Sequence, residues 1–435
     1  MNIEMNIDSN RPKYKKSRPS TANILVLGDF SGKDRLDAAS NANAEIRNMF
    51  TLDPNQLDAA VAKVGPNIEM KLGSETVSFQ MASMDSFHPD KLLKTRPLQA
   101  AATPIAVDPP ETPAPVDEKP ARSPSGDDDF ERLLGRAKSA PDAASPAVRS
   151  TLDKLSADAV AGDTAPDPGE NTPDDKSMIL REVLRAPQFQ RLESTWRSLQ
   201  WLGEHIDYDE SASIWLVDVD LSAIDSWSED LSRQVAAGPG AATALIVLHD
   251  YSTTEQPGLQ SLARLAGSLN TLAFAGAENS LAGLNGDMSK AVALDASDFA
   301  PAEGGGAGPS ADLANVVLGF PNVLLRQPYG KRSDPIDAFN FDELGSDPDH
   351  DAFLWGSASI ITTLMWLTDT LIIDDALLVT YDDGGGQAIK SPTGAYMTDS
   401  AAEALLARGI VPLLAQRGGT DIRVPRLQTM AISAI

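Results

Sequence analysis

The amino-acid sequence predicts an α/β fold with mixed sheets, in which a small N-terminal β-α-β-β-α unit precedes a larger α/β domain. Two observations favour this fold class. Apolar runs of strand length alternate along the chain with amphipathic stretches of helix length. A stretch rich in Pro, Ala and Asp separates the two parts, and 435 residues are enough for two or three domains with cores of their own.

The N-terminal unit is expected over residues 21–97. It opens with the apolar run NILVLGDFSG at 23–32, which ends in turn residues and predicts a buried strand. A helix is expected within 52–66, because Asp53 is a good N-cap and a Gly-Pro pair stops the periodic pattern. Alternating apolar residues at 68–82 predict a hairpin with one buried face, and SMDSFHPDKLLK then starts another helix.

The stretch 98–177 predicts a disordered linker, because its Pro-, Ala- and Asp-rich composition cannot bury enough apolar surface to offset the entropy of ordering. A short helix is expected near 128–138, where Phe130, Leu133 and Leu134 fall on one side. Two interpretations of this helix stay open: a docking peptide for a partner, and a transient helix without a partner.

The larger domain is expected over residues 178–435 and begins with a helix at 178–203 that holds two of the six Trp residues. Apolar side chains recur on it at steps of three and four: Phe189, Leu192, Trp196, Leu199 and Leu202. This stripe favours a packed helix face, with an aromatic ligand pocket as the alternative. Strand-like runs follow at 212–221, 242–251 and 271–279, and an apolar helix at 354–371 suits a core better than a membrane.

Composition and charge exclude several functions. The formal net charge of −26 argues against nucleic acid as a partner, and the basic run at 11–18 fits a flexible N-terminal tail over 1–20. The chain has no Cys, so neither disulfides nor thiolate metal sites are expected. It also has neither a signal-peptide pattern nor a run of about eighteen apolar residues, so we expect a cytoplasmic protein without membrane insertion.

No catalytic, cofactor-binding or metal-binding residue is expected. The turn GDFSGK at 28–33 lacks the glycine spacing of a P-loop and the Ser or Thr after its Lys. His249 and Asp250 are adjacent on a predicted strand and therefore point to opposite faces, which makes them a poor acid/base pair. The acidic loop at 342–351 lacks the ligand order of an EF-hand, and YDDGGGQ at 381–387 fits a turn between strands.

Four segments resemble, in the same order, motifs of the large contractile-sheath subunit of type VI secretion systems, TssC/VipB. They are ILREVLRAPQFQRLESTWRSLQWL at 179–202, FPNVLLRQPYGKRSDPIDAFNFDEL at 320–344, FLWGSASI at 353–360 and TDSAAEALLARGIVPLL at 398–414. The resemblance marks these positions as structural: Phe189, Leu192, Glu193, Trp196, Arg197, Pro328, Tyr329, Gly330, Phe339, Phe341, Trp355 and Gly356.

The N-terminal unit resembles the small sheath subunit, TssB/VipA. The similar segments are ILVLGDFSG at 24–32, FTLDPNQLDAAVAKVGPNIEMKL at 50–72 and VSFQMASMDSFHPDKLLKTRPLQ at 77–99. The order of small subunit, linker and large subunit in one polypeptide implies a fusion of the two sheath proteins.

The resemblance implies a non-enzymatic subunit of a type VI secretion-like contractile sheath in the bacterial cytoplasm, associated with a membrane-anchored apparatus. Its implied partners are further copies or other sheath subunits, an inner tube protein and a baseplate. Strands exchanged between protomers would join them, and contraction would drive the tube outward to deliver effectors. A recycling AAA+ unfoldase is a further implied partner, docking at Phe130, Leu133 and Leu134.

Two departures keep alternatives open. Large sheath subunits usually continue past the region that ends here at Ile435, and the part similar to the small subunit ends soon after Pro97. A non-contractile adaptor, cap or baseplate-associated protein is therefore the second interpretation. An α/β enzyme that uses His249 or the turn at Gly28 is a remote third.

Overall fold

The computed structural model describes the residues 22–33, 44–72, 75–95, 173–206, 212–286, 288, 293–300, 308–345, 348–382 and 387–435. All described residues belong to one compact unit. The expected N-terminal tail and the expected helix with Phe130, Leu133 and Leu134 lie outside the described residues, as does nearly all of the expected linker.

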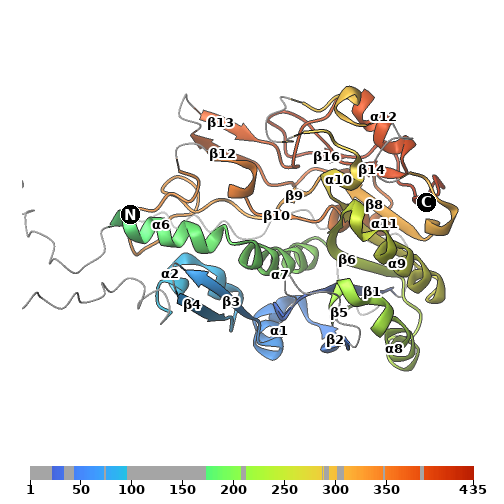
Figure 1. Ribbon diagram of the computed structural model, residues 1–435, viewed down its shortest axis with the longest axis horizontal. Coiled ribbons are helices and arrows are strands. Elements are labelled where there is room, and N and C mark those ends of the chain that lie inside the picture. Colours follow the sequence, from blue (N-terminus) through green and yellow to red (C-terminus); the bar gives the residue numbers. More distant parts are fainter. Residues whose placement is uncertain are drawn as a thin grey trace, which may run out of the picture. The chain divides into compact units, whose positions relative to one another are not determined.

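A seven-stranded sheet forms the centre of the described unit, in the order β14-β8-β7-β6-β1-β5-β2 (Figure 1). Its strands are β1 (Ala22–Gly28), β2 (Asn48–Leu52), β5 (Ala212–Asp218), β6 (Ala244–Tyr251), β7 (Leu272–Ala277), β8 (Val316–Phe320) and β14 (Ile410–Pro412). Neighbouring strands pair in parallel except β2, which pairs antiparallel with β5 at the edge. The fold is therefore mixed α/β, as the sequence predicts.

The position of β1 differs from the sequence expectation. We expected β1 to belong to a small N-terminal unit, but β1 lies between β5 and β6 in the large sheet. Ile24 and Val26 face one hydrophobic core, whereas Leu25 and Leu27 face another. A strand that is apolar on both faces needs helices on both sides, which a small hairpin unit cannot supply but a doubly covered parallel sheet can.

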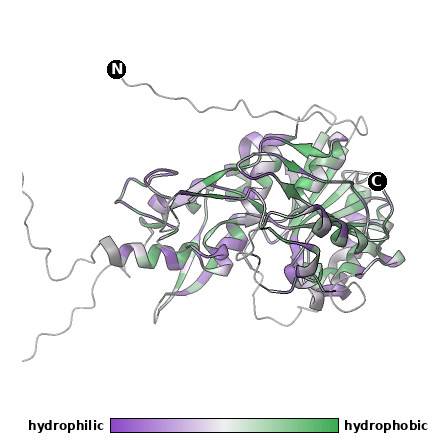
Figure 2. Ribbon diagram, turned by 90° about the horizontal axis from the view of Figure 1, so that it is seen from above, coloured by the Kyte–Doolittle hydropathy of each residue, from purple (hydrophilic) through white to green (hydrophobic). Residues whose placement is uncertain are grey.

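Helices cover both faces of the sheet. The first core contains β1, β5 and β6 side chains together with α7 (Pro187–His205) and α11 (Ser359–Thr368). The second contains the opposite side chains with α8 (Ile224–Ala237), α9 (Gln256–Ser268) and α12 (Asp399–Ala407). Figure 2 shows this arrangement as hydrophobic colour along the strands, with hydrophilic residues on the outer turns.

Helix α11 fills the position that the sequence predicts for a core helix. Every residue from Ser359 to Leu367 is buried. Within the described part of the chain, no helix combines the length and the apolar character needed to cross a bilayer.

The rest of the N-terminal unit packs beside α7. The expected helix within 52–66 is present as a 3-10 turn (Pro54–Gln56) followed by α1 (Leu57–Val64), with the Asp53 carboxylate accepting from the backbone N–H of Asn55. The expected hairpin is confirmed: β3 (Asn67–Leu72) pairs antiparallel with β4 (Glu75–Gln80). Its buried side chains join the first core, together with residues of α2 (Pro89–Leu92) and α6 (Pro173–Leu184).

Smaller elements complete the unit. The short strands are β9 (Val323–Leu324), β10 (Trp355–Gly356), β11 (Ile372–Ile373), β12 (Val379–Asp382), β13 (Gln387–Lys390), β15 (Leu414–Ala415) and β16 (Ile422–Arg423). They form the pair β9–β10, the sheet β11-β16-β15 and the pair β12–β13, which flanks the turn predicted at 381–387. The remaining helices are α10 (Asn279–Ala282) and the 3-10 turns Met84–Phe87, Leu221–Ala223, Thr253–Glu255, Ala296–Asp298, Ala311–Leu313 and His350–Ala352.

Candidate functional site

Trp196 on α7 is a packing residue that joins this helix to the N-terminal part of the chain. Its indole N–H donates to the carbonyl oxygen of Phe30 at 3.0 Å, and the two rings meet edge to face at 5.2 Å between centroids. Both side chains are fully buried. The other side chains of the predicted stripe are buried as well, so the packed-face interpretation of this helix is confirmed.

The glycine-rich turn after β1 binds an internal carboxylate. Asp218, at the end of β5, accepts from the backbone N–H of Phe30 at 3.1 Å and of Ser31 at 3.3 Å. The Ser31 hydroxyl also donates to Asp218, and the guanidinium of Arg47 forms ion pairs with Asp218 and Asp29. These backbone N–H groups already donate to a carboxylate of the same chain. The turn therefore has a structural role, and its N–H groups are poorly placed to bind a phosphate.

His249 and Asp250 do not form an acid/base pair. His249 Nε2 lies 3.0 Å from the Glu255 carboxylate. Burial alone would raise the pKa of Glu255, but the bond and charge of His249 and the donors of Ser252 lower it to about 2. Asp250 instead lies against Ser357 and Gly276, and burial raises the pKa of its carboxyl group. The two side chains thus have separate partners, as expected for neighbours on one strand.

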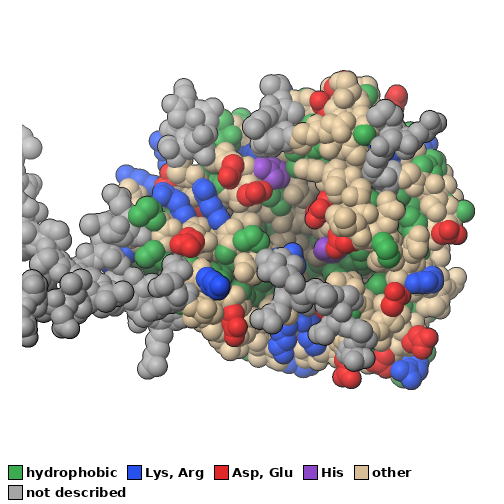
Figure 3. All heavy atoms as spheres, in the orientation of Figure 1, with side chains coloured by type: hydrophobic (Ala, Val, Ile, Leu, Met, Phe, Trp, Pro, Cys, Tyr) green, Lys and Arg blue, Asp and Glu red, His purple; other side chains and the backbone are tan. Residues whose placement is uncertain are grey.

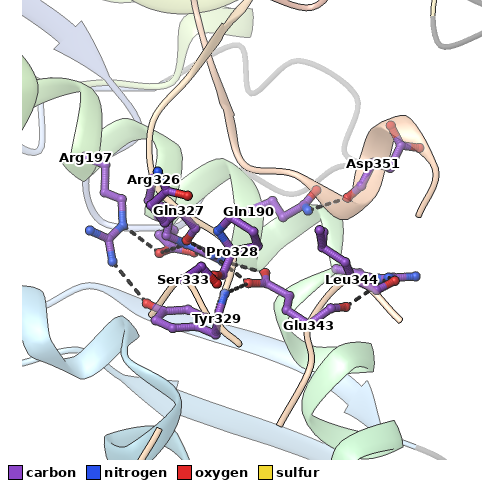
Figure 4. Close-up of polar contacts among 12 residues, drawn as sticks. Gln190, Arg197, Arg326, Gln327, Pro328, Tyr329, Ser333, Glu343, Leu344 and Asp351 are labelled. Carbon is purple, nitrogen blue, oxygen red and sulfur yellow. Dashed lines mark hydrogen bonds and ion pairs between the residues drawn. The ribbon is translucent and has the colours of Figure 1, made fainter. Parts of the chain in front are cut away.

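The most distinctive polar feature of the described residues is a buried cluster of charges between α7 and the segment 326–343 (Figure 4). Arg326 lies at its centre. The Arg326 guanidinium donates to both carboxylate oxygens of Glu343, each at 2.7 Å, and to Glu193 at 2.9 Å. Arg197, one turn after Glu193 on the same helix, donates to the same Glu193 oxygen at 2.7 Å. We call Glu193, Arg197, Arg326, Tyr329 and Glu343 the charged junction.

Tyr329 completes the charged junction. Its backbone N–H donates to Glu343 at 2.7 Å, and its hydroxyl accepts from Arg197 at 3.2 Å. The Arg326 guanidinium carbon lies 4.3 Å from the centre of the Tyr329 ring, within the range of a cation–π contact. Burial is the main cause that raises the pKa of the Tyr329 hydroxyl, so this group stays protonated at neutral pH.

The charges of the junction stabilise one another. Burial would raise the pKa of Glu193, but the neighbouring Arg326 and Arg197 lower it below its ordinary value. Burial would likewise lower the pKa of Arg326, yet Glu193 and Glu343 raise it well above the ordinary value. Two guanidinium groups thus face two carboxylates, and each charge has a partner of opposite sign. Such a group of charges fixes geometry and is unsuited to proton transfer.

Helices α6 and α7 also hold the surrounding loops through backbone carbonyls. Arg181 donates to the carbonyl of Asp342 at 2.8 Å, and Arg185 donates to the carbonyls of Glu343 and Leu344 at 3.1 and 3.0 Å. Further along α7, the Gln190 amide reaches the carbonyl of Asp351 at 2.8 Å, and the Ser194 hydroxyl reaches that of Trp355 at 2.7 Å. The helix pair therefore positions two segments, 342–344 and 351–355.

The positions marked by the sheath resemblance lie in and around this junction. Glu193, Arg197 and Tyr329 belong to it, and Pro328 and Gly330 form the turn that carries Tyr329. The rings of Phe339 and Phe341 lie 6.0 Å apart on the loop that leads to Glu343. Trp355 stacks on His350, and Gly356 has no room for a side chain because a β-carbon there would lie 2.8 Å from Leu325. Phe189, Leu192 and Trp196 face the sheet core.

Sequence reasoning did not single out the two central residues, Arg326 and Glu343. Both lie inside the similar segment at 320–344. The sequence does contain one indication of a buried ion pair: Arg326 directly follows the apolar run VLL, where burial is expected. An unpaired charge at a buried position would be strongly destabilising. Its carboxylate partners could not be read from the sequence, because Glu193 is distant along the chain.

The N-terminal part also contacts the loop of the junction. Asp90, at the start of α2, accepts from the backbone N–H groups of Asp337 and Ala338 at 2.9 and 3.1 Å. The His88 ring meets the Tyr329 ring edge to face at 5.0 Å. Residues 22–95 therefore contact both the sheet and the junction.

A pocket of about 380 Å³ lies on the same loop, lined by Lys331, Pro335, Ile336, Phe339, Asn340 and Phe341. Lys331 is the one charged residue of this lining, which contains neither a carboxylate nor a histidine that could act with it in catalysis. The described residues contain no group of three or more His, Asp or Glu side chains placed to bind a metal ion. Consistent with this, the acidic side chains on the face shown in Figure 3 are scattered and do not form one large cluster.

Comparison with known proteins finds the large-subunit family that the motifs of residues 179–414 indicate. Residues 309–424 match the VipB family, described as EvpB/VC_A0108, tail sheath N-terminal domain. Over 270 residues the chain is 21% identical to the type VI secretion system sheath protein TssC1 of Pseudomonas aeruginosa. This alignment covers 53% of the present chain and 54% of TssC1. The chain is a distant homologue of the TssC/VipB sheath family.

The TssC/VipB match includes most of the charged junction. Arg326, Tyr329 and Glu343 fall within residues 309–424, and Trp355 does as well. The chain spans about half the length of the curated relative that it matches. TssC/VipB proteins are structural and non-enzymatic, which agrees with a junction whose charged groups are paired with one another.

Proposed function

We propose that this chain is a structural subunit of a type VI secretion-like contractile sheath, with the parts similar to the small and large subunits joined in one polypeptide. Residues 21–97 would be the small-subunit part and residues 178–435 the large-subunit part, connected by the linker at 98–177. The assembly would surround an inner tube, contact a baseplate and drive effector delivery by contraction.

The observation that carries this proposal is the charged junction, which joins α7 to the segment that matches the VipB family. Arg326 and Glu343 come from the matched span, whereas Glu193 and Arg197 come from α7, outside it. Helix α7, which lies in one of the segments that resemble the large sheath subunit, thus lies in direct contact with the matched loop. The motif residues of this helix make structural contacts, which favours a role in assembly.

A rigid protomer suits that role. A sheath subunit transmits force only if its interface elements stay fixed relative to its core, and buried charge pairs favour a single arrangement of the loops they join. The covered parallel sheet supplies the core, and the junction attaches the loops to it. Contraction would then be a repacking between protomers.

Negative-stain electron microscopy tests the proposal, on the purified chain alone and after coexpression with the sheath and tube proteins encoded beside it. Rings or tubes formed by the chain alone, or jointly with those proteins, are the expected results. Joint assemblies in which the chain lies only at the ends would support the cap or adaptor alternative. Small particles under both conditions would overturn the proposal.

The recycling AAA+ unfoldase belongs to the same proposal as a further partner, docking on the predicted helix at 128–138. A pull-down with the unfoldase, comparing the chain with its Phe130→Ala, Leu133→Ala, Leu134→Ala variant, tests it. Equal recovery of both chains would remove the docking assignment and leave the sheath proposal intact.

A further inference from the structure

His205 is a fully buried histidine at the C-terminal end of α7, and its two ring nitrogens face two different oxygens. Nδ1 lies 2.7 Å from the backbone carbonyl oxygen of Trp201, one turn earlier on the helix. Nε2 lies 3.4 Å from a carboxylate oxygen of Asp375, in the segment that follows β11. The Asp375 side chain is 27% exposed, so this ion pair lies at the edge of the core.

These contacts determine where the protons of the His205 ring lie. A carbonyl oxygen only accepts hydrogen bonds, so Nδ1 carries a proton. In a neutral ring Nε2 would then present its lone pair to the Asp375 carboxylate, and two acceptors would face each other. A second proton, on Nε2, replaces this repulsion by an ion pair. The carboxylate is the poorer site for that proton, because imidazole is the stronger base by about two to three pH units in model peptides.

Two further features favour a charged His205 ring. The ring stacks on the Trp201 indole, with 3.8 Å between centroids and 20° between planes, which is a cation–π arrangement when the imidazole is charged. His205 is also the last residue of α7, where the negative end of the helix dipole favours a cation. Burial opposes the charge, and the carboxylate, the indole and the helix end together offset that opposition.

The elements packed against α7 bring few other charges to this end of the helix. Helix α11 and strand β10 contain no ionisable side chain, and neither does the 3-10 turn 54–56. The two charged residues of β3 are exposed, and α6 precedes the opposite end of α7. On α7 itself, Glu204 accepts from a glutamine amide at 3.0 Å. Within the described part of the chain, Asp375 is therefore the carboxylate that forms an ion pair with His205.

The segment that carries Asp375 is fixed to the three-stranded sheet β11-β16-β15. The backbone N–H of Ala376 donates to the carbonyl oxygen of Thr420 at 2.9 Å, and the Thr420 hydroxyl donates to the carbonyl oxygen of Asp374 at 2.9 Å. The ion pair therefore attaches this sheet to the C-terminal end of α7. The charged junction attaches other loops to the same helix through guanidinium groups, which stay charged at all ordinary pH values. An imidazole loses its charge near neutral pH, so this attachment responds to pH.

We propose that His205 forms a pH-sensitive attachment: its imidazolium holds Asp375 and the sheet β11-β16-β15 against α7 at neutral and lower pH, and deprotonation weakens this contact. A His in an unfolded chain titrates at about pH 6.5, and an adjacent carboxylate in the fold retains the proton to higher pH. The stabilisation is therefore complete below about pH 6.5 and is lost as the pH rises through the folded-state value. This inference concerns the fold of one chain and does not depend on the sheath proposal.

Long-range ¹H–¹⁵N NMR of the full-length, histidine-labelled chain tests the proposal directly, because the chain contains only four His. The spectrum distinguishes an imidazolium from both neutral tautomers. Asp375→Asn removes the carboxylate charge from a partly exposed side chain and should leave the fold intact. The signal that this substitution shifts, and that His205→Gln removes, belongs to His205. It should titrate about 1 pH unit or more higher in the parent chain than in Asp375→Asn.

Urea denaturation at pH 6 and at pH 9 measures the consequence for stability. At pH 6 Asp375→Asn should lower the ratio of folded to unfolded chains on the order of fivefold, and at pH 9 this difference should disappear. Asp374→Asn, at an exposed neighbour on the same segment, is the matched control for the loss of one negative charge and should have the same small effect at both pH values.

Two outcomes would overturn the inference. The first is a His205 signal that titrates at the same pH in the parent chain and in Asp375→Asn, or the absence of any histidine signal that responds to this substitution. The second is a loss of stability in Asp375→Asn that is equal at pH 6 and at pH 9. Neither result depends on whether the chain forms sheath-like assemblies.

Discussion

Helix α7 contacts two regions of the molecule that are held by different forces. Toward the sheet, Trp196 and the aliphatic stripe bury apolar surface against β1 and its turn. Toward the loops, Glu193 and Arg197 bind Arg326 and Tyr329 through charges and hydrogen bonds. Apolar packing tolerates small shifts of the side chains, whereas a buried charge that loses its partner strongly destabilises the fold. The first region supplies stability and the second determines how the loops are placed.

The largest effect is expected from the apolar region. Trp196→Ala should lower the free energy of unfolding by about 4–6 kcal/mol, because it leaves a cavity and removes the hydrogen bond to the Phe30 carbonyl. Urea denaturation followed by circular dichroism measures the loss. Trp201→Ala is the matched control on the same helix: Trp201 is half-buried, so its substitution should cost clearly less. Equal losses for the two variants would show that Trp196 has no special role.

A somewhat smaller loss is expected from the charged junction. Arg326→Met should lower the free energy of unfolding by about 3–5 kcal/mol, because Glu343 and Glu193 then lack their central cation in a buried place. Arg332→Met, an exposed Arg on the same loop, should change the value by no more than about 0.5 kcal/mol.

The comparison is sharpened by replacing all four charges of the junction together. If Glu193→Leu, Arg197→Met, Arg326→Met and Glu343→Leu are combined, the free energy of unfolding should return close to that of the parent chain or exceed it, because no unpaired charge remains. A quadruple variant as unstable as Arg326→Met would contradict the view that the junction specifies loop placement more than it stabilises.

The smallest effect is expected at the His249–Glu255 pair. The folded-state pKa of Glu255 is lowered from 4.5 to about 2, so the pair stabilises the fold above pH 4.5 and this contribution disappears as the pH falls toward 2. Glu255→Gln should therefore flatten the decline of stability across that range. At pH 7 the cost should stay below about 1 kcal/mol, because both side chains are partly exposed. Acid denaturation of both chains followed by circular dichroism is the measurement, and parallel curves would refute the assignment.

The spacing of apolar residues predicted helices and strands correctly where one period, helical or alternating, runs through the whole segment. The stripe through Phe189 and Trp196 predicted a buried helix face, and alternation around Ile68 predicted the hairpin. The charged junction could not be predicted, because Arg326 meets Glu193 only after two distant segments pack. The family motifs identified Glu193, Arg197 and Tyr329 as structural positions without indicating that they touch.

The sequence by itself determined the apolar and capped segments, the absence of disulfides and the relationship to the sheath family, since each depends on neighbouring residues or on motif order. Only the tertiary structure decided that β1 enters the large sheet between β5 and β6. The physical reason is that an apolar strand carries the same local pattern wherever it pairs. Its partners are selected by which open sheet edges and helix faces the complete chain brings within reach, and no local pattern contains that information.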